Sequence, residues 1–244
     1  MFVVFIISTL AMLKTNKPME PINSDLLQFL NELKKNNNRE WFADRKSIFD
    51  IHNREAKAFF AGVEERLKET DDIESHKLMR IYRDVRFSKD KTPYKARFAG
   101  SFKRATEHLR GGYFLNIEPG NTMVGGGFYG PNPADLLRIR KEFEMDATEI
   151  NEIISDKKFK EIFPKGLEGD GVKTAPKGFS KDSEAIVLIR KKQFYAMRSF
   201  TDNEVLSKTF VDEVIDTFVT LRPFFNYMSE VLTTNLNGES IITE

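Results

Sequence analysis

The sequence predicts an α+β fold, with N-terminal helices, a central mainly antiparallel sheet and C-terminal helices. Apolar residues recur at helical spacing to about residue 68, alternate with a period of two between residues 73 and 130, and return to helical spacing after residue 133. No internal repeat and no strand-helix-strand alternation interrupts this order. The 22 Phe among 244 residues are enough to build a packed core. We therefore expect a single domain over residues 21–244.

The first residues read differently from the rest. Residues 1–13, MFVVFIISTLAML, hold about a dozen apolar side chains, whereas crossing a bilayer takes roughly 20. No Lys or Arg precedes this run, and no small-residue cleavage site follows it. It is interpreted as dispensable, as a targeting or interface segment, or as a strand. We expect removal of residues 1–20 to leave a folded domain.

Two helices are predicted next. Ser24 is a suitable N-cap for an apolar stripe that ends at the run of three Asn at 36–38. Asn38 suits the start of a second helix, which continues to about Lys68. Trp41, near its beginning, is expected in the core.

The middle of the chain predicts strands. Residues 81–87 alternate in character, and residues 96–103 can form a second strand. Residues 112–118 and 121–129 flank Glu-Pro-Gly-Asn, whose Pro and Gly favour a type II turn. These two segments are therefore expected to pair as an antiparallel hairpin.

The helices resume at Asn132, a predicted N-cap, with Pro133 in the first helical position. Asp146 and Glu149 form a capping-box-like pair for a short helix. Residues 164–182 hold four Gly and form a loop long enough to be a flap.

The chain after this loop ends in a strand and helices. Residues 194–200 are strand-like, and Thr201 with Glu204 forms a capping box that opens an apolar-faced helix. Pro223 should break or kink that helix.

Charge is unevenly distributed along a chain whose net charge is only +1. Residues 80–104 carry nine basic against two acidic side chains, and residues 200–244 carry eight acidic against two basic ones. The basic segment can bind an external anion, or it can dock internally on the acidic C-terminal helix.

Within the basic segment, residues 83–95 read RDVRFSKDKTPYK, and this pattern resembles the uncharacterised family known as domain of unknown function 2461. The resemblance covers roughly residues 23–230 and extends over further short motifs, at 112–113, 117–120, 125–127, 136–140, 176–179 and 194–195. It implies one family unit and no established activity. Relatives carry an Asp-His-Pro-like step after the Pro-Lys-Gly motif, whereas this chain has Lys181 to Glu184 there, so no catalytic His is expected at that point.

The candidate ligand site is the basic signature itself. Guanidinium groups bind phosphate or carboxylate bidentately, ammonium groups add charge, and a Tyr ring can stack on a base. The candidate residues are Arg83, Arg86, Lys89, Lys91, Tyr94 and Lys95. Arg86→Ala is expected to weaken anion binding. The two Asp of the segment are interpreted as partners that fix the rotamers of the cations.

We expect a small phosphate- or carboxylate-bearing ligand, bound by an enzyme acting on a small anionic metabolite or by a simple binding protein. The alternatives are a module for nucleic acid, which is less favoured, or for an acidic protein, and a purely structural basic segment. Residues 125–130 match G-x-G-x-x-G formally, but an antiparallel hairpin with two Pro in its turn argues against dinucleotide binding.

No cofactor and no metal are expected, and the catalytic residues stay unknown. The chain has no Cys, and its three His show no spacing typical of zinc ligands. The absence of Cys fits a cytoplasmic protein, and the alternative is export or membrane association if residues 1–13 are a signal.

Overall fold

The computed structural model describes residues 19–242, so the apolar run at residues 1–13 lies outside the described residues. Five strands form one sheet in sequence order, and every neighbouring pair is antiparallel. The strands are β1 (Ile73–Leu78), β2 (Phe98–Arg104), β3 (Gly112–Ile117), β4 (Thr122–Phe128) and β5 (Phe194–Phe200). The predicted α+β class is confirmed, including the hairpin of β3 and β4.

The N-terminal helices are α1 (Ser24–Lys35), α2 (Arg39–Asp44) and α3 (Lys46–Leu67). The cap of α1 is Asn23 rather than Ser24, because the Asn23 side chain accepts the N–H of Asp25. The single helix expected from Asn38 is divided at Arg45, whose backbone leaves helical geometry. Trp41 is half-buried at the edge of the core, with the Arg45 guanidinium 4.5 Å from its ring centre.

Seven helices lie between and after the last two strands in the described part of the chain, and their bounds are α4 (Pro133–Met145), α5 (Thr148–Ser155), α6 (Lys157–Ile162), α7 (Ile186–Ile189), α8 (Asp202–Val205), α9 (Phe210–Thr220) and α10 (Arg222–Thr233). Asn132 caps α4 with Pro133 in its first turn, as predicted. The α5 prediction is wrong in detail, since its cap position is Ala147 and carries no side-chain hydrogen bond.

The predicted capping box of Thr201 and Glu204 is present, but it opens the one-turn helix α8 instead of the long helix. Pro223 lies in the first turn of α10, so the predicted break separates α9 from α10.

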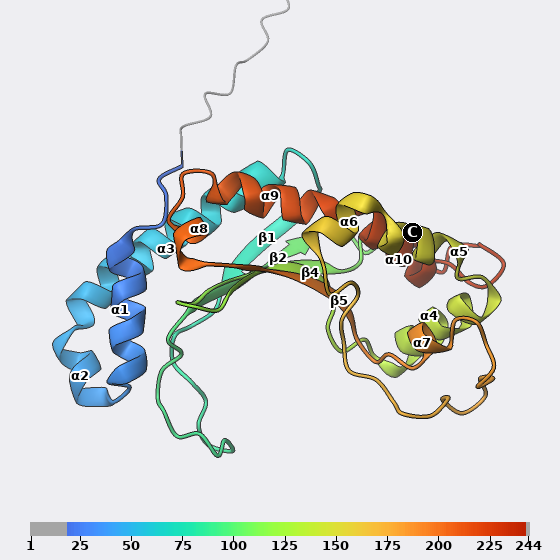
Figure 1. Ribbon diagram of the computed structural model, residues 1–244, viewed down its shortest axis with the longest axis horizontal. Helices are drawn as coiled ribbons and strands as arrows, with labels where there is room; N and C mark the ends of the chain where they lie inside the picture. Colours follow the sequence, from blue (N-terminus) through green and yellow to red (C-terminus); the bar gives the residue numbers. More distant parts are fainter. Residues whose placement is uncertain (1–18, 243–244) are drawn as a thin grey trace, which may run out of the picture.

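One face of the sheet is covered by α3, α9 and α10 (Figure 1). The Phe102 ring of β2 stacks 5.9 Å from Phe60 of α3, and the Tyr113 ring of β3 lies 4.8 Å from Phe218 of α9. These contacts place the core of the protein between the sheet and the three helices.

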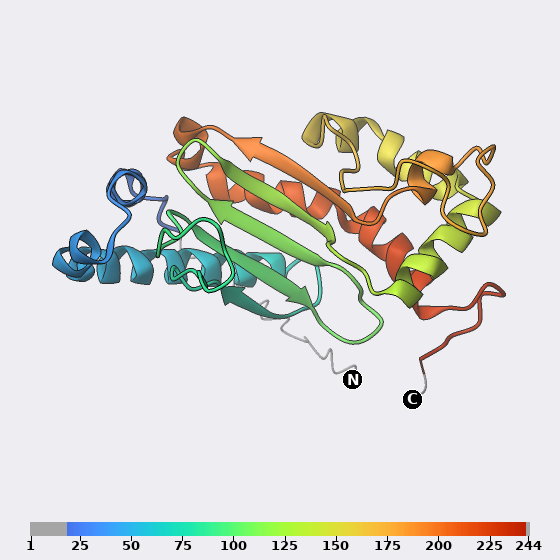
Figure 2. The ribbon, with the colours of Figure 1, turned by 90° about the horizontal axis from the view of Figure 1, so that it is seen from below.

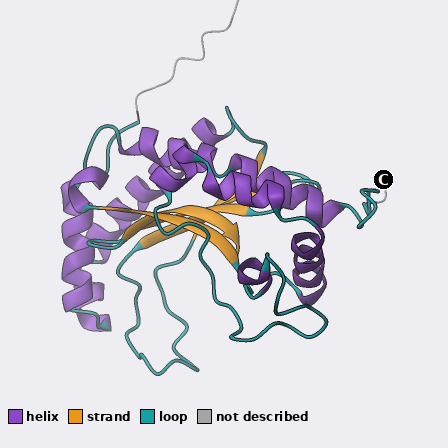
Figure 3. Ribbon diagram, turned by 45° about the vertical axis from the view of Figure 1, so that its right-hand side comes forward, coloured by secondary structure: helices purple, strands orange, loops and turns teal. Residues whose placement is uncertain are grey.

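The opposite side chains of the sheet point away from these helices. Ser101, Phe114, Gly125 and Met197 are register partners across β2 to β5, one residue out of phase with the core positions. No helix lies over the centre of this face in the views from below and from the side (Figures 2 and 3). We call it the open face.

The predicted strand at 81–87 is wrong. Residues 79–97 instead form an irregular excursion between β1 and β2, which hangs below the sheet on its open side (Figure 1). We call residues 79–97 the basic arm. None of the described helices combines the length and apolar composition needed to cross a membrane.

Candidate anion site at the stem of the basic arm

The stem of the basic arm is held as a short antiparallel pairing. Tyr82 and Tyr94 form a bridge, and the N–H of Lys95 donates to the carbonyl of Ile81 at 2.7 Å. Asn37, in the loop after α1, clamps the stem from outside: its amide donates to the Tyr94 carbonyl at 2.9 Å, and its oxygen accepts the Tyr94 N–H at 3.1 Å. The arm therefore leaves the sheet in a defined direction.

Tyr94 is a structural element of this stem. Its side chain is buried, with 7% exposure, and its ring stacks 4.0 Å from the ring of Phe42. Burial raises the pKa of the Tyr94 phenol. In this arrangement the ring anchors the arm to α2 and is not open for stacking on a ligand.

Three of the predicted cations, Arg83, Arg86 and Lys91, have internal partners, whereas Lys89 forms no ion pair among the described residues. Arg86 binds the Asp84 carboxylate through two nitrogens, at 3.0 and 2.7 Å, and Lys91 donates to the carbonyl of Val85 at 2.9 Å. Arg83 pairs with Asp90. The Thr92 N–H and hydroxyl, followed by Arg83, lower the pKa of Asp90 to about 2. The interpretation of both Asp as rotamer-fixing partners agrees with these contacts.

At the stem of the arm, fewer of the positive charges are neutralised by a carboxylate. The pKa of Lys95 is lowered, first by its partial burial and then by the charges of Arg97, Arg80 and Arg83. Among the described residues, neither Lys95 nor Arg97 forms an ion pair with a carboxylate, whereas Lys103 and Arg104 further along β2 each do. The pKa of Asp84 is lowered mainly by its hydrogen bonds from Arg86 and less by the charge of Arg80.

This stem cluster overlaps the predicted site only in part. It contains Arg83 and Lys95, while Arg86, Lys89 and Lys91 lie further out on the arm. The residues that sequence reasoning missed are Arg80 and Arg97, which flank the signature on either side. The feature of the sequence that could have indicated them is Pro93, where the chain turns back. The two sides of the arm then run antiparallel, which brings residues 80–83 close to residues 93–97.

Arg97 also connects the cluster to the open face. It directly precedes β2 and stands in the same alternating set as Ala99 and Ser101. On this face Asn116 is fully buried, and its side-chain oxygen has no hydrogen-bond partner. Arg97 therefore lies at the margin of the open face, whereas the Asn116 oxygen is enclosed by the protein.

The glycine run of β4 is explained by packing within the sheet. A Cβ on Gly125 would lie 2.0 Å from the Ala196 carbonyl oxygen, and one on Gly126 would lie 2.5 Å from that of Gly112. Neighbouring strands thus require glycine at these positions.

The loop at 164–182 is only partly free to move as a flap. Glu168 exchanges backbone hydrogen bonds with Tyr195 of β5, and Val172 donates to the carbonyl of Arg190 at 2.9 Å. The ties fix residues 168–172, while the following residues run along the same side of the sheet as the basic arm (Figure 1). The prediction of a flap therefore applies only to residues 173–182.

The basic arm does not use the acidic C-terminal region for its charge balance. Among the described residues, no ion pair joins residues 80–104 to an acidic residue after position 200. The acids of α9 pair elsewhere: Asp212 with Arg66 at 2.6 Å and Asp216 with Lys158 at 2.5 Å.

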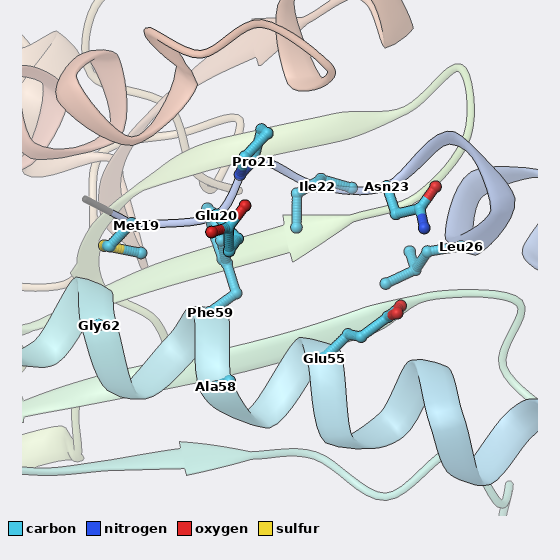
Figure 4. A pocket seen from close by; sticks show the side chains of 10 residues that line it. All are labelled: Met19, Glu20, Pro21, Ile22, Asn23, Leu26, Glu55, Ala58, Phe59 and Gly62. Carbon is cyan, nitrogen blue, oxygen red and sulfur yellow. The ribbon is translucent and has the colours of Figure 1, made fainter. Parts of the chain in front are cut away.

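A cavity of about 790 Å³ lies where residues 19–23 cross α3 (Figure 4). Its ionisable lining residues are Glu20 and Glu55, without any Lys or Arg, and the rest of its lining is mainly apolar. This composition does not suit an anion.

The family model for the conserved hypothetical protein DUF2461 matches residues 25–227. A search of curated proteins and a search of solved structures each found no match. The match covers the basic arm, the whole sheet and the helices around it as far as the first half of α10.

Proposed function

Because the chain belongs to the DUF2461 family, whose description names no activity, we propose a function from the geometry: it binds a small phosphate- or carboxylate-bearing ligand at the stem of the basic arm. Lys95 and Arg97 are the central ligand-binding residues. Arg80 and Arg83 complete the cluster at its edge. Arg86, Lys89 and Lys91 on the outer arm contribute a weaker, more exposed attraction.

Lys95 carries this proposal. Its side chain is half-buried, its pKa is lowered by this burial and then by the charges of Arg97, Arg80 and Arg83, and no carboxylate of the described chain pairs with it. Such crowding of like charges is unfavourable unless an anion joins the cluster. A bound phosphate would accept hydrogen bonds from the guanidinium forks and would restore the affinity of Lys95 for its proton.

A macromolecular anion is the second candidate, and Phe87 favours it. This ring at the tip of the arm is 96% exposed, and the Arg86 guanidinium lies 6.0 Å from its centre. A small ligand at the stem has no use for an apolar ring at the tip. An unpaired base could stack on it.

The test measures the thermal shift produced by inorganic phosphate, pyrophosphate and a short single-stranded oligothymidine. We expect pyrophosphate to raise the Tm of the wild-type protein, and we expect Lys95→Gln to weaken this binding about tenfold, or about 1.4 kcal/mol. Lys89→Gln removes the same charge from the outer arm and is the matched control, with a small effect.

Two outcomes would reject the proposal: none of the three probes raises the Tm, or the two Lys variants lose affinity equally. The variant Phe87→Ser separates the candidates. It should weaken oligothymidine binding alone if the tip serves a nucleic acid, and it should change neither affinity if the ligand is small.

A further inference from the structure

A second site lies at the other end of the molecule, where α4, α5 and α10 meet the C-terminal turn (Figure 1). A cavity of about 190 Å³ opens here. Tyr227 of α10 lines it. This side chain is only 6% exposed, yet its hydroxyl has no hydrogen-bond partner.

Carboxylates surround this hydroxyl. Glu142, Glu149 and Glu230 line the cavity with it. Burial, followed by the charges of Glu142, Glu149 and Asp146, raises the pKa of Tyr227, so its phenol keeps its proton. The hydroxyl therefore has one hydrogen to donate and lone pairs that can accept.

The one cation in the lining is already engaged. Arg138 binds Glu142 at 2.5 Å and donates to the carbonyl oxygens of Thr234 and Asn235 at 3.0 and 3.2 Å. Among the described residues, Glu149 and Glu230 form no ion pair. The cavity thus combines an excess of negative charge, carried by solvent-exposed Glu149 and Glu230, with a buried hydroxyl that has no partner. The cost when nothing is bound lies with the hydroxyl.

We propose that this cavity binds a small aliphatic amine, with an ammonium group placed between the Tyr227 hydroxyl and the free carboxylates. An ammonium has three donors and suits acceptors that are spread around a cavity. Met145, Val231 and Leu236 supply apolar lining for the attached carbon chain. A metal ion fits less well, because no group of three His, Asp or Glu in the described region is arranged to hold one.

The experiment titrates the full chain with 1,4-diaminobutane and n-butylamine by calorimetry, with potassium and magnesium chloride at equal ionic strength as references. We expect the diamine to bind best, because Glu149 and Glu230 offer two uncompensated charges. Glu149→Gln should weaken binding about tenfold. Glu152→Gln, on the same helix but outside the lining, is the matched control and should bind as the wild type does.

Tyr227→Phe tests the hydroxyl separately. It should weaken amine binding about fivefold while leaving the Tm of the unliganded protein unchanged or higher, since it removes an unsatisfied buried group. The proposal is overturned if neither amine binds, if potassium or magnesium binds as well as the diamine, or if Glu149→Gln and Glu152→Gln are equivalent. In those cases the cavity holds water or counter-ions only. Binding at the stem of the basic arm is unaffected by either result.

Discussion

Individual cations in the basic arm differ in how fully their charge is compensated, although the sequence presents them as equivalent. Arg86 is bound twice by its neighbour Asp84, and such a pair at an exposed tip adds little to stability. Lys95 is half-buried and has cationic neighbours instead. Sequence spacing showed that the charges were clustered, but it could not show which charge lacked a partner, because that depends on the path of the arm.

The lowered pKa of Lys95 predicts a pH dependence of anion binding. Binding needs the protonated ammonium. As the pH rises, the affinity for an anion should therefore start to decrease at a pH below about 10.4, the ordinary pKa of Lys. Sulfate is the suitable probe, since its own charge is constant between about pH 7 and 10. Lys95→Arg stays protonated throughout this range and should show a flat profile. Parallel profiles for the two proteins would contradict the assignment.

The same shift has a definite sign for stability. The unfolded chain binds the Lys95 proton more tightly than the folded chain does, because the folded pKa is the lower one. Between the two pKa values the contribution of Lys95 to stability therefore rises with pH. At neutral pH, Lys95→Gln should not destabilise the unliganded protein.

Among the elements, most of the helical segments, the β3–β4 hairpin and the strands β2 and β5 were predictable, while the first strand, the arm and the breaks between successive helices at Arg45 and after α8 were not. β1 was missed because it is an edge strand with polar residues on both faces, among them Glu74, Ser75 and Lys77. Residues 81–87 imitate a strand through their alternation, but no second strand pairs with them beyond the Tyr82 bridge. Whether an alternating segment becomes a strand depends on its pairing with a distant segment, and the periodicity of the sequence does not indicate that pairing.

The clamp by Asn37 should keep the basic arm ordered. Asn37→Ala removes both hydrogen bonds to the Tyr94 backbone, at a cost of roughly 1–3 kcal/mol to the local order of the arm. Trypsin should then cut within residues 80–97 faster, and pyrophosphate should bind more weakly because the stem is less preorganised. Asn36→Ala is the control, since that side chain bonds only to the Glu32 carbonyl in its own helix. Equal cleavage rates for both variants would show that the clamp is unimportant.

At the scale of the whole molecule, a buried charged network joins elements that are far apart in the chain. Arg104 of β2 is fully buried and binds Asp71, whose side chain is 1% exposed and which lies in the turn before β1. The Tyr113 hydroxyl of β3 donates to the same carboxylate, and Arg104 also donates to Asn226 of α10 at 3.1 Å. Since none of these residues belongs to the predicted apolar pattern, sequence reasoning assigned Arg104 merely to the basic segment.

This network predicts a large and specific loss of stability. Asp71→Asn keeps the shape of the side chain but leaves a buried guanidinium without its counter-charge, which costs about 3–5 kcal/mol. At about 2–4 °C per kcal/mol for a chain of this size, the Tm should fall by between about 6 and 20 °C. Asp72→Asn is the matched control: its exposed carboxylate forms no ion pair in the described structure, and its Tm should stay close to that of the wild type. Similar melting temperatures for the two variants would mean that the network contributes nothing and that apolar packing between the sheet and its three covering helices alone holds the fold together.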